Sequence, residues 1–177
     1  NIKYSVVIPI LNSSKILDEL VSRLFIVMDS LKEPFEIICV DDCSEDTSWN
    51  TLKRLKVKWD SQLKIILLAE NFGQHNATLC GMRQANGEFL ITLDDDLQHQ
   101  PEDIPNLLNE IENRELDVIY GIPMTENHKS NFRRISGNIW NKGTNKFDDG
   151  LGKGSSFRVL KKTLVNDIVS HQHHFIY

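Results

Sequence analysis

The sequence has few cysteines, and their arrangement gives neither a disulfide framework nor a cysteine zinc site. Among 177 residues only Cys39, Cys43 and Cys80 are present, an odd number with no C-x-x-C spacing. Such a pattern argues against a small domain stabilised by disulfides or zinc. Cys39 and Cys80 lie in apolar or mixed runs, which is typical of buried thiols in a reducing compartment.

Long hydrophobic runs and an excess of positive charge are also absent. No apolar stretch approaches the roughly 20 residues that span a bilayer, so no segment is expected to cross a membrane. The sequence holds 20 Lys and Arg against 25 Asp and Glu, a net charge of −5, which argues against a nucleic-acid partner. The length and the 40% hydrophobic content predict one domain over residues 1–177. The missing initial Met and the apolar ending suggest a piece excised from a longer protein.

A glycine-rich phosphate loop is the third absence. The first hydrophobic run ends in Pro-Ile-Leu-Asn-Ser-Ser, residues 9–14, rather than G-x-G-x-x-G, so a nicotinamide cofactor is not expected. The sequence does contain five short, nearly continuous hydrophobic runs, which predict strands covered on both faces, at residues 4–10, 35–40, 63–68, 88–93 and 117–120. Helical patterns alternate with them. The alternation predicts a single α/β domain with a Rossmann-like, mostly parallel sheet flanked by helices.

Turn signals mark where the helices begin and end. Asp46 or Ser48 is expected to open one helix and Pro101 another, whereas Asn86-Gly87 is expected to close one.

Three consecutive carboxylates follow directly after the fourth predicted strand. Because side chains alternate along extended chain, Asp94 and Asp96 should face one side and Asp95 the other. The two carboxylates on one side and the amide oxygen of Gln98 can converge on Mg²⁺ or Mn²⁺, which prefer oxygen ligands and accept substrate phosphates. A solvated turn that caps the next helix is the alternative, but it does not explain three adjacent like charges beside an apolar run. The cluster therefore predicts a metal site.

Polar residues also follow other predicted strands, at the edge where parallel sheets bind ligands. Asp41 and Asp42 end the second strand, where a carboxylate can accept the N–H of a base or a ribose hydroxyl; a capping turn is an equally weighted alternative. Residues 71–75, Asn-Phe-Gly-Gln-His, either hydrogen-bond a ligand or connect strand to helix through a positive φ at Gly73, and the connection is favoured. The three histidines of residues 171–174 have no acid or cysteine beside them, so a chain end is favoured over a zinc site.

A basic segment covers residues 127–147. It carries five cations and no acid, namely Lys129, Arg133, Arg134, Lys142 and Lys146. Four apolar residues recur at helical spacing within it, which predicts one apolar stripe with cationic flanks, at Phe132, Ile135, Ile139 and Trp140. Two interpretations stay open: an amphipathic helix packed on the sheet, or an element that faces anionic lipid head groups or a phosphate.

Taken in order, these segments resemble family 2 glycosyltransferases of the GT-A fold. The resemblance is closest to the polyprenyl-phosphate branch, which includes dolichyl-phosphate mannose synthases and bacterial undecaprenyl-phosphate sugar transferases. It covers residues 4 to about 162 and rests on Val7-Ile8-Pro9 with Asn12, Glu36 to Ser44, Asn71 to His75, Gly81 with Ala85 and Gly87, Asp94 to Gln98 with Pro101-Glu102, and Phe157-Arg158. The sequence departs from the family pattern at Leu11, Ser13, Cys43 and Pro123.

The resemblance implies roles for individual residues. The residues implied to bind the nucleotide sugar are Pro9, Asn12, Asp41, Asp42, Asn71, Asp94 and Asp95. The implied ligands of Mg²⁺ or Mn²⁺ are Asp94, Asp96 and Gln98, with Asp96 the catalytic residue. The implied contacts to a phosphate or to the acceptor are Arg133, Arg134 and Arg158.

The resemblance also implies an activity. It is that of an inverting, metal-dependent glycosyltransferase of the hexosyl type, which moves a sugar from a nucleotide sugar to a dolichyl or undecaprenyl phosphate in cell-wall or lipopolysaccharide synthesis. Such a domain would work at the cytoplasmic face of a membrane, and the membrane-spanning segments would lie outside this chain. The resemblance is compatible with a monomer and with a homo-oligomer. A lipid phosphate needs no general base, because its second pKa of about 6 leaves it mostly ionised near neutral pH.

Three alternatives accompany that implied activity. One is transfer to a sugar hydroxyl in polysaccharide synthesis. Another is an inactive nucleotide-sugar-binding domain, to which the departures at Ser13 and Pro123 point. The last is a metal-dependent phosphohydrolase, which the absent glycine cradle disfavours.

Overall fold

In the computed structural model, which describes residues 1–121 and 155–170, the five expected strands form and one more joins them. The strands are Tyr4–Ile10 (β1), Phe35–Asp41 (β2), Leu63–Leu67 (β3), Phe89–Thr92 (β4), Val118–Tyr120 (β5) and Arg158–Lys161 (β6). The strand β6 was not predicted from the sequence, because a four-residue run with a charged residue at each end lacks the long apolar pattern of the others.

The strands form one sheet in the order β3-β2-β1-β4-β6-β5. The pairs β1–β2, β1–β4 and β2–β3 are parallel, whereas β6 runs antiparallel to both β4 and β5. The prediction of a mostly parallel sheet is therefore confirmed. The insertion of β6 places Arg158 opposite Thr92, the last residue of β4, and so brings a late part of the chain to the edge that follows the central strands.

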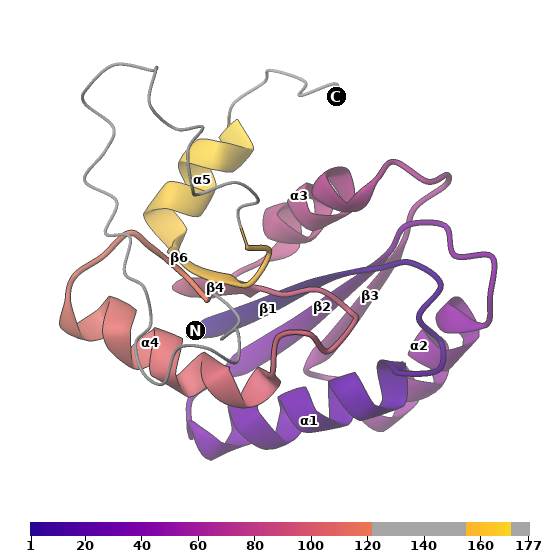
Figure 1. Ribbon diagram of the computed structural model, residues 1–177, viewed down its shortest axis with the longest axis horizontal. Helices are drawn as coiled ribbons and strands as arrows, with labels where there is room; N and C mark the ends of the chain where they lie inside the picture. The colour runs from indigo at the N-terminus through magenta and orange to yellow at the C-terminus, as the bar shows by residue number, and fades with distance from the viewer. Residues whose placement is uncertain (122–154, 171–177) are drawn as a thin grey trace, which may run out of the picture.

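Helices cover both faces of the sheet (Figure 1). On one face lie α1 (Leu17–Ser30), α2 (Ser48–Lys58), the 3₁₀ turn η1 (Pro101–Asp103) and α4 (Ile104–Asn113); on the other lie α3 (Gln74–Gln84) and α5 (Lys162–Ser170). Alternate residues of β1 therefore enter two cores: Val6 and Ile8 pack towards α1, and Val7 packs with α3 residues. This double cover explains why the strand sequences are continuously apolar.

The predicted helix starts at Ser48 and Pro101 are confirmed, but the role given to Asn86-Gly87 is wrong. The helix α3 already ends at Gln84, and Gly87 is instead needed for close packing. Its N–H donates to the Ser5 hydroxyl at 2.8 Å, and a Cβ at this position would lie 2.6 Å from the Ser5 backbone nitrogen. None of the described helices has the length and apolarity required to cross a bilayer.

Candidate active site

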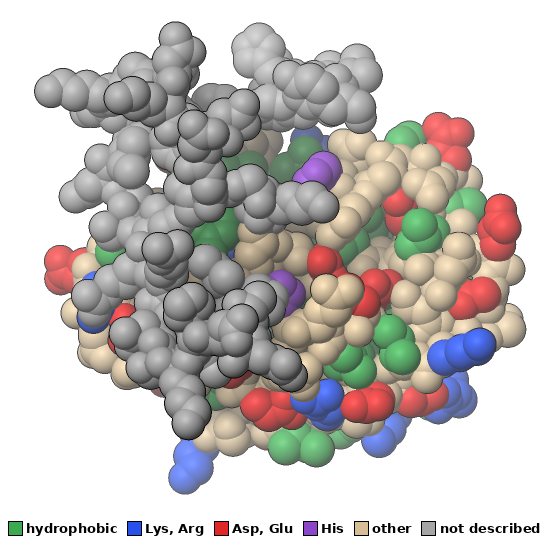
Figure 2. Space-filling model, in the orientation of Figure 1, with side chains coloured by type: hydrophobic (Ala, Val, Ile, Leu, Met, Phe, Trp, Pro, Cys, Tyr) green, Lys and Arg blue, Asp and Glu red, His purple; other side chains and the backbone are tan. Residues whose placement is uncertain are grey.

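The candidate site lies at the carboxyl ends of β1, β2, β3 and β4, where the loops that follow these strands meet. Two cavities of about 200 and 190 Å³ open there, and both are lined by Pro9, Gln74 and Asp94. Several acidic side chains gather near the middle of the face shown in Figure 2. The edge predicted from the sequence thus holds two cavities.

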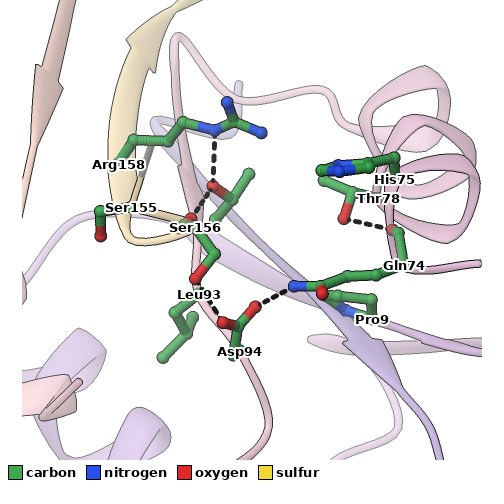
Figure 3. A pocket seen from close by; sticks show the side chains of 10 residues that line it. Pro9, Gln74, His75, Thr78, Leu93, Asp94, Ser155, Ser156 and Arg158 are labelled. Carbon is green, nitrogen blue, oxygen red and sulfur yellow. Dashed lines mark hydrogen bonds between the residues drawn. The ribbon is translucent and has the colours of Figure 1, made fainter. Parts of the chain in front are cut away.

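The two cavities differ in the chemistry of their walls. The first, called here the Arg158 cavity, is lined by Pro9, Gln74, His75, Thr78, Thr92, Leu93, Asp94, Ser155, Ser156 and Arg158 (Figure 3). The second, called here the acidic cavity, is lined by Pro9, Ile10, Leu11, Asp42, Gln74, Asp94, Asp95 and Asp96. Because Gln74 and Asp94 stand between them, the two cavities are adjacent halves of one groove.

Asp94 is held from two sides at the boundary between the halves. The side-chain amide of Gln74, from the first turn of α3, donates to Oδ1, and the hydroxyl of Ser156, just before β6, donates to Oδ2 (Figure 3). Each oxygen of the carboxylate retains a second lone pair for another partner. The two hydrogen bonds thus fix the orientation of the Asp94 side chain.

The predicted alternation of the three acids is wrong, because β4 ends at Thr92, Asp95 and Asp96 lie in a turn, and all three acids line the acidic cavity; Asp95 differs from the others in its partners. Its Oδ2 accepts the backbone N–H of Leu11 at 3.0 Å and the hydroxyl of Ser13, so it fastens the loop after β1. Burial raises the pKa of the Asp95 carboxyl, and these hydrogen bonds offset that effect only in part. Ser13, a departure from the family pattern, thus has a clear structural role here.

Asp96 lines the acidic cavity and is exposed, whereas Gln98 is exposed but lines neither cavity. The backbone N–H of Gln98 donates to Asp96 Oδ1 at 3.0 Å, in a turn where Leu97 has a φ of 58°. Within residues 1–121 and 155–170, no three Asp, Glu, His or Cys side chains are placed to hold a metal ion by themselves. Asp94 and Asp96 line the acidic cavity together and could share a cation, with a ligand completing its shell.

The two acids after β2 have different surroundings. Asp42 is buried and accepts two backbone N–H groups at 2.8 Å, that of Phe72 on Oδ1 and that of Gly73 on Oδ2. Asp41 is fully buried; its Oδ1 accepts the N–H of Ser44 at 2.7 Å, and its Oδ2 has no hydrogen-bond partner among the described residues. Of the two, only Asp42 lines a cavity.

Asn12 joins the loop after β1 to the loop after β2. Its N–H donates to the Ser44 hydroxyl at 2.9 Å, its Oδ1 accepts the N–H of Glu45 at 2.8 Å, and its φ is 55°. Asn71 plays a local part, because its Oδ1 accepts the N–H of Gly73 at 3.0 Å. Gly73 itself has a φ of 87°, which confirms the predicted positive φ.

A further carboxylate braces the same pair of loops. Asp46 accepts the N–H of Ser48 at 2.8 Å and the N–H of Ser14 at 3.1 Å. Burial would raise the pKa of this carboxyl, but hydrogen bonds from the two serines outweigh it and lower the pKa to about 2. The rim of the site is thus tied together by acids that accept backbone N–H groups.

Arg158 is positioned by β6 beside the end of β4. Its Nε donates to the Thr92 hydroxyl oxygen at 3.2 Å, and Thr92, which is buried, donates in turn to the carbonyl of Ser156. The guanidinium then reaches over the cavity towards His75 (Figure 3). Sequence reasoning missed Thr92, Ser156 and the role of Gln74; the polar pair Ser155-Ser156 before an apolar run was the one signal that could have indicated a strand end here.

Several predicted residues lie outside the described part of the chain. They are Arg133 and Arg134, the rest of the basic segment 127–147, Pro123 and the histidines of residues 171–174. Their predicted roles stay predictions.

Comparison with known families gives one match along nearly the whole chain. A model described as glycosyl transferase family 2 matches residues 5–167. Among curated relatives, the undecaprenyl-phosphate 4-deoxy-4-formamido-L-arabinose transferase of Pseudomonas fluorescens is 34% identical over 169 residues, which are 94% of this chain and 49% of the relative. The enzyme with the same name from Shewanella sediminis is 42% identical over 108 residues, 61% of this chain and 33% of the relative. The chain thus spans about half, or less, of the length of these relatives.

Solved structures of other proteins share this fold. The structure of Staphylococcus aureus TarS 1-349 has a TM-score of 0.64 at 23% identity, covering 94% of this chain and 49% of that one. A mannosyltransferase from Pyrobaculum calidifontis, in complex with GDP-Man and Mn²⁺, has a TM-score of 0.58 at 20% identity, covering 68% and 35%. At these identities the likeness shows the fold, and it confirms the predicted GT-A architecture. The names of these relatives specify the transfer of an arabinose derivative, which is a pentose, so they do not support the expected transfer of a hexose.

Proposed function

This chain belongs to glycosyl transferase family 2, and from that premise we propose that it transfers a sugar from a nucleotide-sugar donor to a polyprenyl phosphate, with undecaprenyl phosphate the first candidate. The observation that carries the proposal is the pair of adjacent cavities at the carboxyl edge of the sheet, one acidic and one bearing Arg158. The names of the relatives support the same acceptor. Because the chain covers only part of those relatives, the activity needs a direct test on this protein.

A divalent cation fits the acidic cavity by the chemistry of its donors. Asp94 and Asp96 offer carboxylate oxygens, the ligands that Mg²⁺ and Mn²⁺ prefer, and these cations accept phosphate oxygens in the rest of their shell. Gln98 remains a proposed third ligand. When bound there, the cation would stabilise negative charge on the leaving diphosphate. The Mn²⁺ bound by the Pyrobaculum mannosyltransferase supports the proposal of a metal but belongs to that protein.

The chain's own residues would align the reactants. Asp94 is held by Gln74 and Ser156, so the diphosphate side of the donor meets a carboxylate of fixed orientation. Asp96 is exposed and lines the acidic cavity. It is proposed as the catalytic residue because it would bind the leaving diphosphate through the cation. A fixed array of this kind lowers the barrier because little reorganisation is needed as charge develops.

The reaction is a single displacement. An oxygen of the acceptor phosphate forms a bond to the anomeric carbon while the bond from that carbon to the β-phosphate oxygen breaks, and the electron pair leaves with the nucleoside diphosphate. One such step inverts the anomeric carbon. No proton has to move when the acceptor is an ionised phosphate. Among the described residues, Asp94 is the only carboxylate that lines the Arg158 cavity, and it is already proposed as a ligand of the cation, which favours this acceptor over a sugar hydroxyl that needs a general base.

A further set of residues is proposed to act at the nucleotide end of the donor. Pro9 and Asp42 line the acidic cavity and are proposed to contact the nucleotide directly. Asn12, Asn71 and Asp41 are proposed to act there through the loops that they hold. For the sugar, a formamido-pentose donor is the first candidate on account of the relatives' names, and hexosyl donors remain in the test panel.

The setting of the reaction follows from the acceptor. A polyprenyl phosphate resides in a membrane, so we place this domain at the cytoplasmic membrane face, with residues 127–147 as the proposed contact to anionic head groups. Arg133 and Arg134 in that segment stay candidates for phosphate binding.

The experiment is a donor panel with lipid extraction. The full chain is incubated with Mn²⁺ or Mg²⁺, undecaprenyl phosphate and UDP- or GDP-linked pentoses and hexoses, and the organic phase is analysed by mass spectrometry. We expect a sugar phosphate lipid and one equivalent of nucleoside diphosphate. Products found only on sugar hydroxyls would favour the polysaccharide alternative. Nucleotide-sugar binding without any product would favour an inactive binding domain, and release of inorganic phosphate would favour a phosphohydrolase.

A further inference from the structure

The Arg158 cavity contains a second set of charged and polar side chains, separate from the three acids of residues 94–96 except for Asp94. Arg158 and His75 lie on opposite walls of the Arg158 cavity, one from β6 and the other from the first turn of α3 (Figure 3). The hydroxyl-bearing residues Ser155 and Ser156 complete the wall beside Arg158. The guanidinium and the imidazole are the hydrogen-bond donors that this cavity of about 200 Å³ offers to a ligand, because the hydroxyl groups of Thr78, Thr92 and Ser156 already donate within the protein.

A hydrogen bond to Thr92 orients the guanidinium of Arg158. Thr92 is buried, its hydroxyl donates to the Ser156 carbonyl, and its oxygen accepts the Nε of Arg158 at 3.2 Å. This uses one N–H of Arg158 and leaves the two terminal nitrogens for the cavity. Among the described residues, no carboxylate lies within 4.0 Å ion-pair distance of that guanidinium. An oriented arginine without an acidic partner is suited to a phosphate, which its fork geometry matches.

The opposite wall supplies a complementary donor. His75 is exposed, so its ring can meet a ligand, and an imidazole offers at least one N–H in either protonation state. It also lies at the start of an 11-residue helix, where the helix dipole favours negative charge. A phosphate held between Arg158 and His75 would sit beside Asp94, at the boundary with the acidic cavity, because both cavities share that residue.

We propose that the Arg158 cavity is the acceptor subsite, in which Arg158 and His75 bind the phosphate monoester of a prenyl phosphate while the donor diphosphate occupies the acidic cavity. This assignment rests on the proposed function for the identity of the acceptor. Gln74 and Asp94 then form the wall across which the acceptor oxygen approaches the anomeric carbon. Without such a partition, two anionic groups in one groove would compete for the same cationic residues.

The test measures binding, so that it does not depend on turnover. The full chain is titrated with farnesyl phosphate and with inorganic phosphate in Mn²⁺-free buffer, and with UDP in the presence of Mn²⁺, for the parent and for His75→Ala and Arg158→Ala. Arg83→Ala is the matched control, because it removes one cation from the last turn of the same helix. Circular dichroism checks that each variant is folded, and His75→Ala keeps the test decisive if the partly buried Arg158 cannot be replaced.

We expect each variant to weaken binding of farnesyl phosphate by about tenfold, the loss of one charged hydrogen bond, with UDP binding unchanged and Arg83→Ala like the parent. Farnesyl phosphate should bind more tightly than inorganic phosphate, which identifies the lipid as the source of the phosphate; equal binding of these two probes would overturn that part. Unchanged affinity for farnesyl phosphate in both variants, or an equal loss of UDP affinity, would overturn the subsite. If the binding results hold but no sugar transfer occurs with any donor, the proposed function fails and the phosphate subsite stands.

Discussion

Replacing Asp42 by asparagine should destabilise the fold before any ligand is considered. Its two carboxylate oxygens accept the N–H groups of Phe72 and Gly73 at 2.8 Å each, in a buried position. Asparagine keeps one acceptor oxygen, but its NH₂ group then faces the other backbone N–H. The variant thus loses one charged hydrogen bond and weakens the second, a cost of about 3 kcal/mol for buried groups that are left unpaired.

The magnitude translates into a thermal shift. At roughly 2–4 °C per kcal/mol for a chain of this size, the melting temperature should fall by about 6–12 °C, measured by calorimetry without donor or metal. Glu45→Gln is the matched control, since it makes the same charge change in the same loop on an exposed side chain that has no hydrogen bond among the described residues. If Asp42→Asn has the same melting temperature as Glu45→Gln and loses only affinity for the donor, then the Asp42 carboxylate binds the nucleotide and does not stabilise the loop.

Three further predictions concern the held carboxylate, the pH dependence and the packing. Ser156→Ala should weaken Mn²⁺ binding by about tenfold in a paramagnetic resonance titration, because the Ser156 hydroxyl holds Asp94. Ser155→Ala should not, since the Ser155 hydroxyl contacts His99 and Phe157 and not Asp94; equal behaviour of the two variants would remove the positioning role. Glu36 is buried, which would raise the pKa of its carboxyl, but Lys64 at 2.6 Å and two hydrogen bonds outweigh burial and lower this pKa. The contribution of Glu36 to the free energy of unfolding should therefore be complete above the ordinary pKa near 4.5 and be lost as the pH falls through the pKa of the folded state. Glu36→Gln should not show this loss. Gly81→Ala would place a Cβ 2.4 Å from Val7 Cγ1, so urea unfolding should show a loss of about 1–3 kcal/mol, and an unchanged midpoint would contradict the packing.

The sequence was sufficient for the layers of the fold and the edge that carries the site. Continuous apolar runs predicted β1 to β5 because both faces of the sheet are covered, and the three acids after β4 marked the right edge. The antiparallel strand β6 could not be predicted in the same way, because its four residues pair with a strand more than 60 positions earlier and carry no pattern of their own.

The roles of single acids were harder to predict than their location. Asp95 and Asp42 were both implied to bind the nucleotide sugar, yet each accepts backbone N–H groups from a neighbouring loop. Such contacts depend on how the loops after β1, β2, β3 and β4 meet, which strand alternation alone does not specify. The clamp on Asp94 was missed for the same reason, since Ser156 lies 62 positions away and is brought close only by β6.

The central claim is that the carboxylates at the end of β4 carry metal-dependent sugar transfer, and the most direct measurement compares the rate of transfer to undecaprenyl phosphate in Asp96→Asn and in the parent. Asp103→Asn is the control, because it makes the same charge change nearby and lines neither cavity. We predict that Asp96→Asn lowers the rate by about a hundredfold or more, while its melting temperature without metal is unchanged or higher because one repulsive carboxylate has gone. Equal rates for the parent and Asp96→Asn at saturating donor and Mg²⁺ would contradict the account.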